Sequence, residues 1–211
     1  MSGQRGLVFV GDEAEVVFDL DSLREDTKGW VVENPDAARR LFRKTVEAHV
    51  ATLDIQALKP ESTIDVEADA RFVASDNFVV DLSNTATVKT YQMLCGFPNL
   101  LAKVEEGVKT AAIKVSPLLH RSSDERIIIE MGDRHEVKLA HYFQALKQQG
   151  HGQEGKLQVN GKSICAYIRD ANGVLWVVSA FWYKDRGGWS IRADLPHSSP
   201  KWPKDFQFLY Y

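Results

Sequence analysis

Several features that would identify a function are missing from this chain of 211 residues. It has two cysteines, Cys95 and Cys165, and their spacing matches no metal-binding motif. Each lies among apolar residues and is expected to be a small core side chain, not half of a disulfide. The sequence has no Cys-x-x-Cys motif, no Gly-x-Ser-x-Gly elbow and no glycine-rich phosphate loop that leads into a helix. We therefore expect neither a metal nor a cofactor.

Charge of one sign and long apolar runs are also lacking. Lys and Arg number 26 against 29 Asp and Glu, and the net charge of -3 provides no general attraction to nucleic acid or to anionic membrane. No stretch approaches the roughly 18 apolar residues of a membrane span. The first twelve residues also lack the apolar run of a signal peptide. These absences predict a cytoplasmic protein without membrane association.

The patterns that are present predict an α+β fold, with several helices packed with an antiparallel β-meander at the C-terminus. Asn34-Pro35-Asp36 is typical of a helix start, and Asp133 with Glu136 has the form of a capping box. The predicted helices are 34–58, 84–95, 101–108 and 133–150. The predicted strands before the meander are 7–10, 15–20, 64–74, 78–82, 112–115 and 127–131.

A linker-like stretch at residues 148–155, rich in glycine and glutamine, divides the sequence into two regions. Residues 1–149 form a mixed α/β region in this interpretation. Residues 156–211 form the meander and an aromatic tail. The two regions could share one core.

The central strand of the meander, from Val174 to Tyr183, is apolar on both faces, so something must cover its second face. Asn160-Gly161 is a strong hairpin signal. The loops at 170–173 and 184–188 would close two further hairpins, pairing Arg169 with Val174 and Tyr183 with Trp189.

That register predicts one apolar face and one mixed face. The mixed face would carry five candidate binding residues, namely Tyr167, Arg169, Trp176, Trp182 and Arg192. Aromatic side chains beside arginine are typical of recognition surfaces. The leading hypothesis is a non-enzymatic binding or interaction protein, whose partner is another protein or a second copy of the chain. A small-molecule ligand is an alternative, and coverage by helices or the tail of the same chain would leave no binding face.

A hydrolase is the second hypothesis, with His120 and Asp124 as candidate catalytic residues in the region from His120 to Glu130. A charged loop of this kind is more simply solvated, and replacing either residue would then leave stability nearly unchanged. His135 and His141 are six residues apart. The zinc-protease pattern requires histidines four apart, so we expect no metal there.

Nucleic-acid binding is the third hypothesis. It depends on two groups of cations: Arg39, Arg40, Arg43 and Lys44 near the N-terminus, and Lys184, Arg186, Arg192, Lys201 and Lys204 near Trp182, Trp189 and Trp202. Aromatic rings beside cations can stack on bases. The net acidity of the chain predicts weak, salt-sensitive binding at most.

Overall fold

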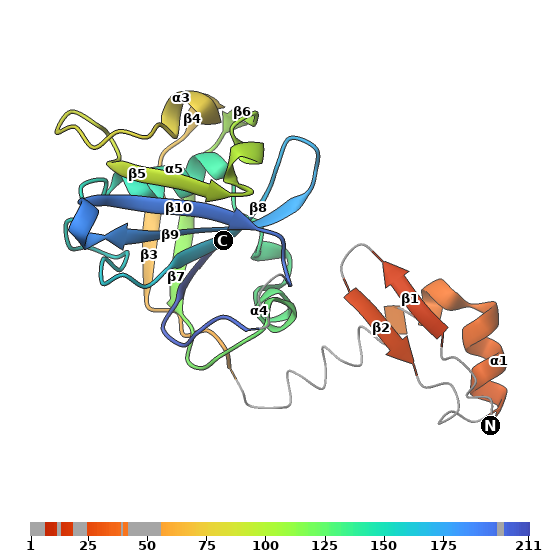
Figure 1. The fold of residues 1–211 in the computed structure, drawn as a ribbon. Helices are drawn as coiled ribbons and strands as arrows, with labels where there is room; N and C mark the ends of the chain where they lie inside the picture. The colour runs from red at the N-terminus through yellow and green to blue at the C-terminus, as the bar shows by residue number, and fades with distance from the viewer. Residues whose placement is uncertain (1–6, 12–13, 19–24, 39, 42–55, 198–200) are drawn as a thin grey trace. The chain divides into compact units, whose positions relative to one another are not determined.

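The computed structural model describes residues 7–11, 14–18, 25–38, 40–41, 56–197 and 201–211 (Figure 1). The chain divides into two compact units, Met1–Ile55 and Gln56–Tyr211. The smaller unit contains strands β1 (Leu7–Gly11) and β2 (Ala14–Phe18), which pair antiparallel as their sequence predicts, and helix α1 (Glu25–Glu33).

Asn34 separates two helical segments of the smaller unit. Its side-chain amide donates a hydrogen bond to the Trp30 carbonyl, 3.1 Å away, at the end of α1. Its own carbonyl accepts from the Ala38 N–H at 2.9 Å, and residues 35–38 and 40–41 are helical. A helix therefore starts at Asn34 as predicted. Residues 39 and 42–55 of that predicted helix lie outside the described residues, and residues 56–58, at its predicted end, are not helical.

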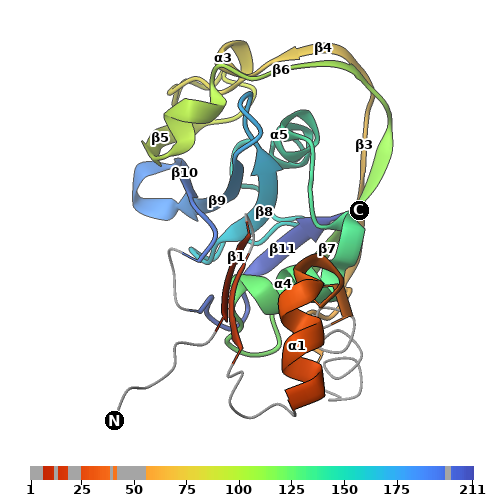
Figure 2. The same ribbon diagram turned by 90° about the vertical axis from the view of Figure 1, so that its right-hand side faces the viewer.

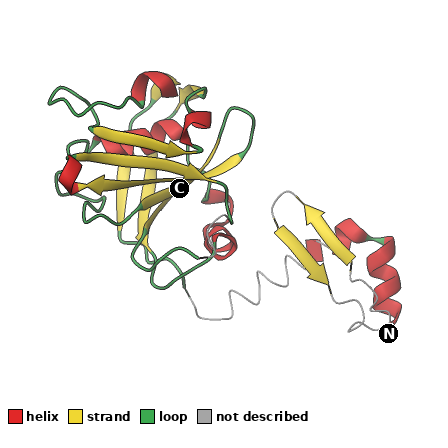
Figure 3. Cartoon of the chain, viewed as in Figure 1, coloured by secondary structure: helices red, strands yellow, loops and turns green. Residues whose placement is uncertain are grey.

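The larger unit is built on a seven-stranded sheet (Figures 1 and 3). Its strands, in spatial order, are β3 (Ser62–Val66), β7 (Ala111–Pro117), β11 (Gln207–Tyr210), β8 (Ile164–Arg169), β9 (Leu175–Tyr183), β10 (Gly188–Asp194) and β5 (Thr90–Cys95). Neighbouring strands are antiparallel except for the parallel pairs β11–β8 and β10–β5. The sheet is therefore mixed, and it takes strands from both sides of residues 148–155.

The remaining elements are short. A separate antiparallel pair consists of β4 (Asp69–Val73) and β6 (Val104–Val108). The helices are α3 (Ala74–Asn77), α4 (Asp124–Met131) and α5 (Leu139–Lys147), with single 3₁₀ turns η2 (Phe97–Leu100), η3 (Gly132–Arg134) and η4 (Lys184–Arg186).

The predicted fold class is wrong, because a large mixed sheet dominates the structure instead of several packed helices. Residues 90–95 and 104–108, predicted to be helical, form β5 and β6, whereas residues 127–131, predicted to be a strand, lie in α4. These apolar stretches are only five or six residues long, and over that length the spacing of apolar residues does not separate a helix from a strand. The chain bends at Asn160-Gly161, where Gly161 has positive φ, but this bend joins no pair of described strands, so the predicted hairpin is wrong.

Helix α5 also starts later than its sequence signal predicts. The predicted cap, Asp133, lies in η3, and the helix begins at Leu139. The buried Glu105 carboxylate, from strand β6, accepts hydrogen bonds from the N–H groups of Leu139 and Ala140 at 3.3 and 2.9 Å. A residue distant in sequence therefore satisfies the free N–H groups of the helix start.

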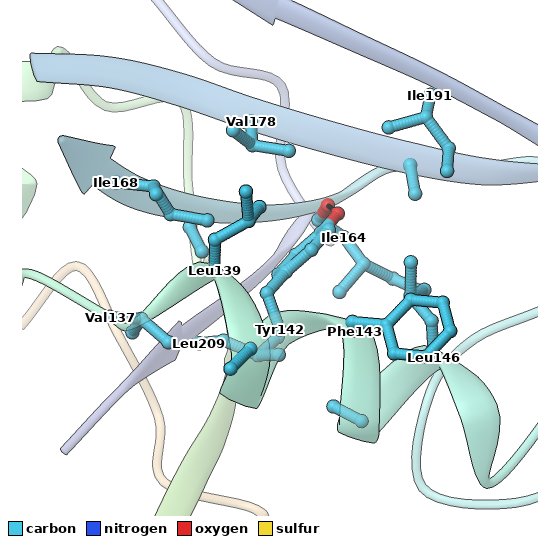
Figure 4. Packing of buried hydrophobic residues seen from close by; sticks show 14 of the residues in the cluster. Val137, Leu139, Tyr142, Phe143, Leu146, Ile164, Ile168, Val178, Ile191 and Leu209 are labelled. Atoms are coloured by element: carbon cyan, nitrogen blue, oxygen red, sulfur yellow. Dashed lines mark hydrogen bonds between the residues drawn. The ribbon is translucent and has the colours of Figure 1, made fainter. Parts of the chain in front are cut away.

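The sheet buries a core on each face. Helix α5 and the β4–β6 pair cover the first face, where Tyr142, Phe143 and Leu146 point toward Ile164 and Ile191 (Figure 4). Helix α4 and the segment before β11 cover part of the second face (Figure 2). The buried residues of this second core include Ile127, Met131, Cys165, Tyr167, Val177 and Phe208.

Both predicted hairpin registers are wrong by one residue. Arg169 pairs with Leu175, and Trp189 pairs with Trp182. In the first hairpin, the Asp170 N–H donates to the Val174 carbonyl at 2.9 Å, so the loop is one residue shorter than expected. In the second hairpin, Gly188 already belongs to strand β10. A one-residue slip exchanges the two faces of a strand, and β9 is therefore inverted relative to the prediction.

Candidate functional site

The five predicted binding residues do not share one face of the sheet. Trp176 and Trp182 lie on the first face, together with Ile168 and Trp189 opposite them. Tyr167, Arg169 and Arg192 lie on the second face, because Arg192 pairs with Ser179 and Ser179 pairs with Cys165.

The two indoles of the first face are half-buried against their own chain. The Trp176 Nε1–H donates to Asp170 at 3.0 Å, and its ring lies against Gly96, where an added Cβ would come within 2.1 Å of the ring. The Trp182 ring packs edge-on to Trp189, with centroids 5.6 Å apart. A Cβ added at Gly152 would come equally close to the Trp182 ring. Neither indole leaves its full surface free for a partner.

The residues of the second face differ in their availability. Tyr167 is fully buried and donates to Asp124 at 2.6 Å; burial, with the Asp124 charge beside it, raises the Tyr167 pKa well above its ordinary value. Arg169 forms hydrogen bonds to both Glu136 oxygens at 2.8 and 3.0 Å. Arg192 is exposed and forms two hydrogen bonds to Asp194 at 2.7 and 2.8 Å, which raise the pKa of its guanidinium. The first two residues stabilise the fold, and Arg192 remains at the surface.

The region from His120 to Glu130 is not a solvated loop, and that expectation is wrong. Asp124 is 1% exposed at the start of α4, and its Oδ1 accepts from both Tyr167 and the Trp202 indole at 2.6 Å. Its Oδ2 accepts from the His197 N–H at 2.8 Å. Glu130 accepts the N–H groups of residues 57 and 58 at 2.7 and 3.0 Å. Both carboxylates connect segments distant in sequence.

The described residues of this region do not assemble a nucleophile with a base. The buried Nε2 of His120 has no hydrogen-bond partner in the described part of the chain. The Ser122 hydroxyl donates to the His120 carbonyl at 3.2 Å instead of to an imidazole. The imidazole of His197 pairs with Glu125 at 2.9 Å, which orients a base, but among the described residues no hydroxyl or thiol contacts it.

Two kinds of feature are absent from the described residues. No three His, Cys, Asp or Glu side chains there come together as a metal-ligand set. No helix there is long and apolar enough to cross a membrane.

The structure assembles a different surface, the aromatic patch, from residues that are separate in sequence. It consists of Tyr91, Phe181, Tyr183, Arg186 and Leu82. The Tyr91 and Tyr183 rings meet edge to face at 5.6 Å, the Phe181 and Tyr183 rings lie 6.1 Å apart, and the Arg186 guanidinium lies 5.5 Å from the centre of the Tyr91 ring. Tyr183 and Leu82 are 37% and 42% exposed. The patch therefore presents aromatic carbon and a cation to solvent.

The absence of a side chain at Gly188 makes room for the aromatic patch. Gly188 pairs with Tyr183 at the start of β10, and a Cβ at Gly188 would come within 2.5 Å of the Leu82 side chain. Leu82 follows Asp81, whose backbone bridges to Thr90 of β5. The patch thus lies at the β9–β10–β5 end of the sheet, away from the residues that α4 buries.

An open pocket of about 500 Å³ adjoins the aromatic patch. Its lining consists of Phe181, Trp182, Tyr183, Lys184 and Asp185 with residues 159–161. Phe181 and Tyr183 belong to both features. The predicted binding residue Trp182 therefore borders the pocket, although its ring also packs in the core.

The sequence contains these aromatic residues, but the predicted register assigns Phe181 and Tyr183 to the apolar core face. Correct hairpin lengths would have placed them on the second face. Nothing local in the sequence brings Tyr91 or Leu82 to them, because β5 joins the sheet through a parallel pairing with β10.

Comparison with protein-family models, with curated proteins and with solved structures gave no match to this chain.

Proposed function

We propose that this is a non-enzymatic binding protein that docks a protein partner on the aromatic patch and the adjoining pocket. The observation that carries the proposal is the cluster in which the Tyr183 ring, 37% exposed, contacts both Tyr91 and Phe181 beside a concave surface. Soluble proteins seldom expose large apolar side chains in groups unless the group binds something. Tyrosine and arginine are also the residue types that contribute most to binding energy at interfaces.

The composition of the patch favours a protein partner over a nucleic acid. Tyr183 and Phe181 offer apolar surface at the rim of the pocket, and Arg186 can pair with one acidic group while it stays stacked on Tyr91. In contrast, the indoles of Trp189 and Trp202 are buried and do not offer faces for base stacking. A cytoplasmic location, expected from the composition, is part of this proposal.

Replacing Tyr183 with Asp tests the proposal, because it puts a charge at the centre of the patch. Immobilised wild-type protein, Tyr183→Asp and Val174→Asp would be exposed to an extract of the source cells, and retained proteins quantified by mass spectrometry. Val174 is 41% exposed at a hairpin turn outside the patch and serves as the matched control. We expect a partner that the control retains and that Tyr183→Asp loses, with affinity reduced by about 2 kcal/mol or more. If every protein retained by the wild type is retained equally by Tyr183→Asp, the patch is not the docking surface.

A further inference from the structure

The two edge strands of the seven-stranded sheet, β3 and β5, differ in how far their outer backbone groups are hydrogen-bonded. At the β3 edge, the Lys156 ammonium donates to the Thr63 carbonyl at 2.5 Å, and the Gln148 amide donates to the Asp65 carbonyl at 2.8 Å. Thr63 and Asp65 are two residues apart, so their carbonyls point to the same side of the strand. Side chains thus occupy the backbone acceptors of this edge.

At the opposite edge, strand β5, no side chain of the described residues makes a comparable hydrogen bond to the backbone. Asp81 exchanges two backbone hydrogen bonds with Thr90, at 3.1 and 2.9 Å, at the first residue of the strand. Beyond Thr90, no other described strand of the unit Gln56–Tyr211 pairs with the outer side of β5. The rest of the strand is half-buried or exposed, and Leu94 is 41% exposed.

Strand β5 has one register irregularity, where its pairing passes from Trp189 to Ser190 of β10, but its sequence lacks the charges and the proline that often prevent edge pairing. Residues 90–95, Thr-Tyr-Gln-Met-Leu-Cys, include no charged residue and no proline. Exposed edges of natural sheets usually carry a lysine, a proline or an inward charge, because an unpaired edge is a template for another strand. Beyond Thr90 this uncharged edge has no partner among the described residues of the unit Gln56–Tyr211, which points to a strand that pairs with something.

We propose that the β5 edge pairs antiparallel with the β5 edge of a second copy of this chain, which joins the two sheets into one continuous sheet. A second copy fits best because two uncharged strands can meet without like-charge repulsion. The nearest cation of the neighbouring strand, Arg192, is already neutralised by Asp194. Residues 90–95 themselves offer a charged peptide no side chain of opposite charge, and the Arg186 guanidinium beside them lies over the Tyr91 ring as part of the aromatic patch. An antiparallel pair of identical strands also has two-fold symmetry, so the assembly closes as a dimer.

This pairing uses the backbone of β5 and does not require the aromatic patch to bind anything. The two proposals can therefore fail separately. Leu94 lies near the far end of β5 from Tyr91, so a change at Leu94 addresses the edge and a change at Tyr183 addresses the patch.

Leu94→Lys tests the edge, since two lysines on paired strands would repel each other and resist burial. The full-length wild type, Leu94→Lys and the control Val174→Lys would be compared by size-exclusion chromatography with light scattering over a range of concentrations. Val174 has the same exposed fraction as Leu94, 41%, but is not on an edge strand. We expect a wild-type dimer, a dimer for Val174→Lys, and a dimer affinity for Leu94→Lys that is at least about tenfold weaker. Circular dichroism confirms that each variant is folded.

Three outcomes would overturn the proposal: a wild type that is monomeric at every concentration, a Leu94→Lys dimer as stable as the wild type, or a dimer that Tyr183→Asp disrupts and Leu94→Lys does not. The last result would assign self-association to the aromatic patch.

Cross-linking locates the contact independently of stability. In a Cys95→Ser background, single substitutions Gln92→Cys, Met93→Cys and Leu94→Cys would be oxidised in the folded protein, and Cys165 is fully buried. Only residues close to the two-fold axis come within disulfide distance of their own copies. We expect one position or two adjacent positions to form a covalent dimer, and Val174→Cys to form none. Absence of a covalent dimer at all three β5 positions would exclude the proposed pairing.

Discussion

At the scale of single residues, Asp124 is the clearest case in which a side chain with catalytic potential stabilises the fold. Its two carboxylate oxygens accept three hydrogen bonds, from strand β8, from Trp202 and from the backbone of His197. Buried donors that lose their acceptor destabilise a protein by about 1–3 kcal/mol each. Asp124 therefore ties helix α4 to two segments that are distant in sequence.

Asp124→Ala is expected to lower the free energy of unfolding by about 2–4 kcal/mol, because the buried Tyr167 hydroxyl and Trp202 indole would lose their acceptor. Urea denaturation followed by fluorescence measures this difference. Asp133→Ala, in an exposed position of the following turn, is the control and should change stability by no more than about 0.5 kcal/mol. An equal effect of the two substitutions would mean that the hydrogen bonds of Asp124 contribute little.

At the scale of elements, the sequence predicted parts of the sheet and missed its assembly. The β1–β2 pair, β7 and the three neighbouring strands β8, β9 and β10 follow from apolar patterns and turn signals. The hairpin registers do not follow, because contacts beyond the pattern decide them: the Asp170 carboxylate accepts the N–H groups of Asn172 and Val174, both within 2.9 Å, and shortens the loop. Parallel partners such as β5 and β11 are separated from their neighbours by dozens of residues, and no local signal marks them.

The candidate site was predictable only in part for the same reason. The sequence identifies the aromatic and arginine residues of the last strands, and Trp182 does border the pocket. The strand register decides which of those residues face outward, and the register in the structure differs from the predicted one by one residue. The contribution of Tyr91 depends on a pairing between strands almost one hundred residues apart.

The contact between the loop after α5 and strand β9 gives a prediction at this scale. Gly152 and Gly161 both have positive φ, +71° and +84°, so alanine strains the backbone at either position. Only at Gly152 would the added Cβ meet the Trp182 ring, at 2.1 Å, whereas Gly161 has no atom within 4 Å. We expect Gly152→Ala to lower the free energy of unfolding by about 1–3 kcal/mol more than Gly161→Ala. If urea denaturation gives equal losses of unfolding free energy for the two variants, the Trp182 ring moves aside at no cost in stability.

At the scale of the whole molecule, the unit Gln56–Tyr211 contains the complete seven-stranded sheet and both of its cores. Its first residues belong to that structure, because Leu58 is buried and the N–H groups of Ala57 and Leu58 donate to Glu130. The unit should therefore be stable by itself when it begins at Gln56.

We expect a fragment of residues 56–211 to unfold cooperatively on heating, and a fragment of residues 60–211 to melt about 5–10 °C lower. The shorter fragment lacks the buried Leu58 side chain and leaves Glu130 without its two donors. Circular dichroism at increasing temperature gives both midpoints. Identical midpoints would place residues 56–59 outside the cooperative unit, and a 56–211 fragment without a cooperative transition would contradict its independence.

The position of β11 has a consequence for how the sheet is assembled during synthesis. Residues 207–210 lie between β7 and β8, antiparallel to one and parallel to the other. The hairpins of β8, β9 and β10 can form as soon as those residues leave the ribosome. The half of the sheet that contains β3 and β7 cannot join them until residue 210 has been translated, because β11, the strand that connects the halves, follows the other six strands of the sheet in the sequence. The protein should therefore acquire its complete fold only after translation has passed β11, and a nascent chain stalled at residue 200 would hold two unjoined half-sheets.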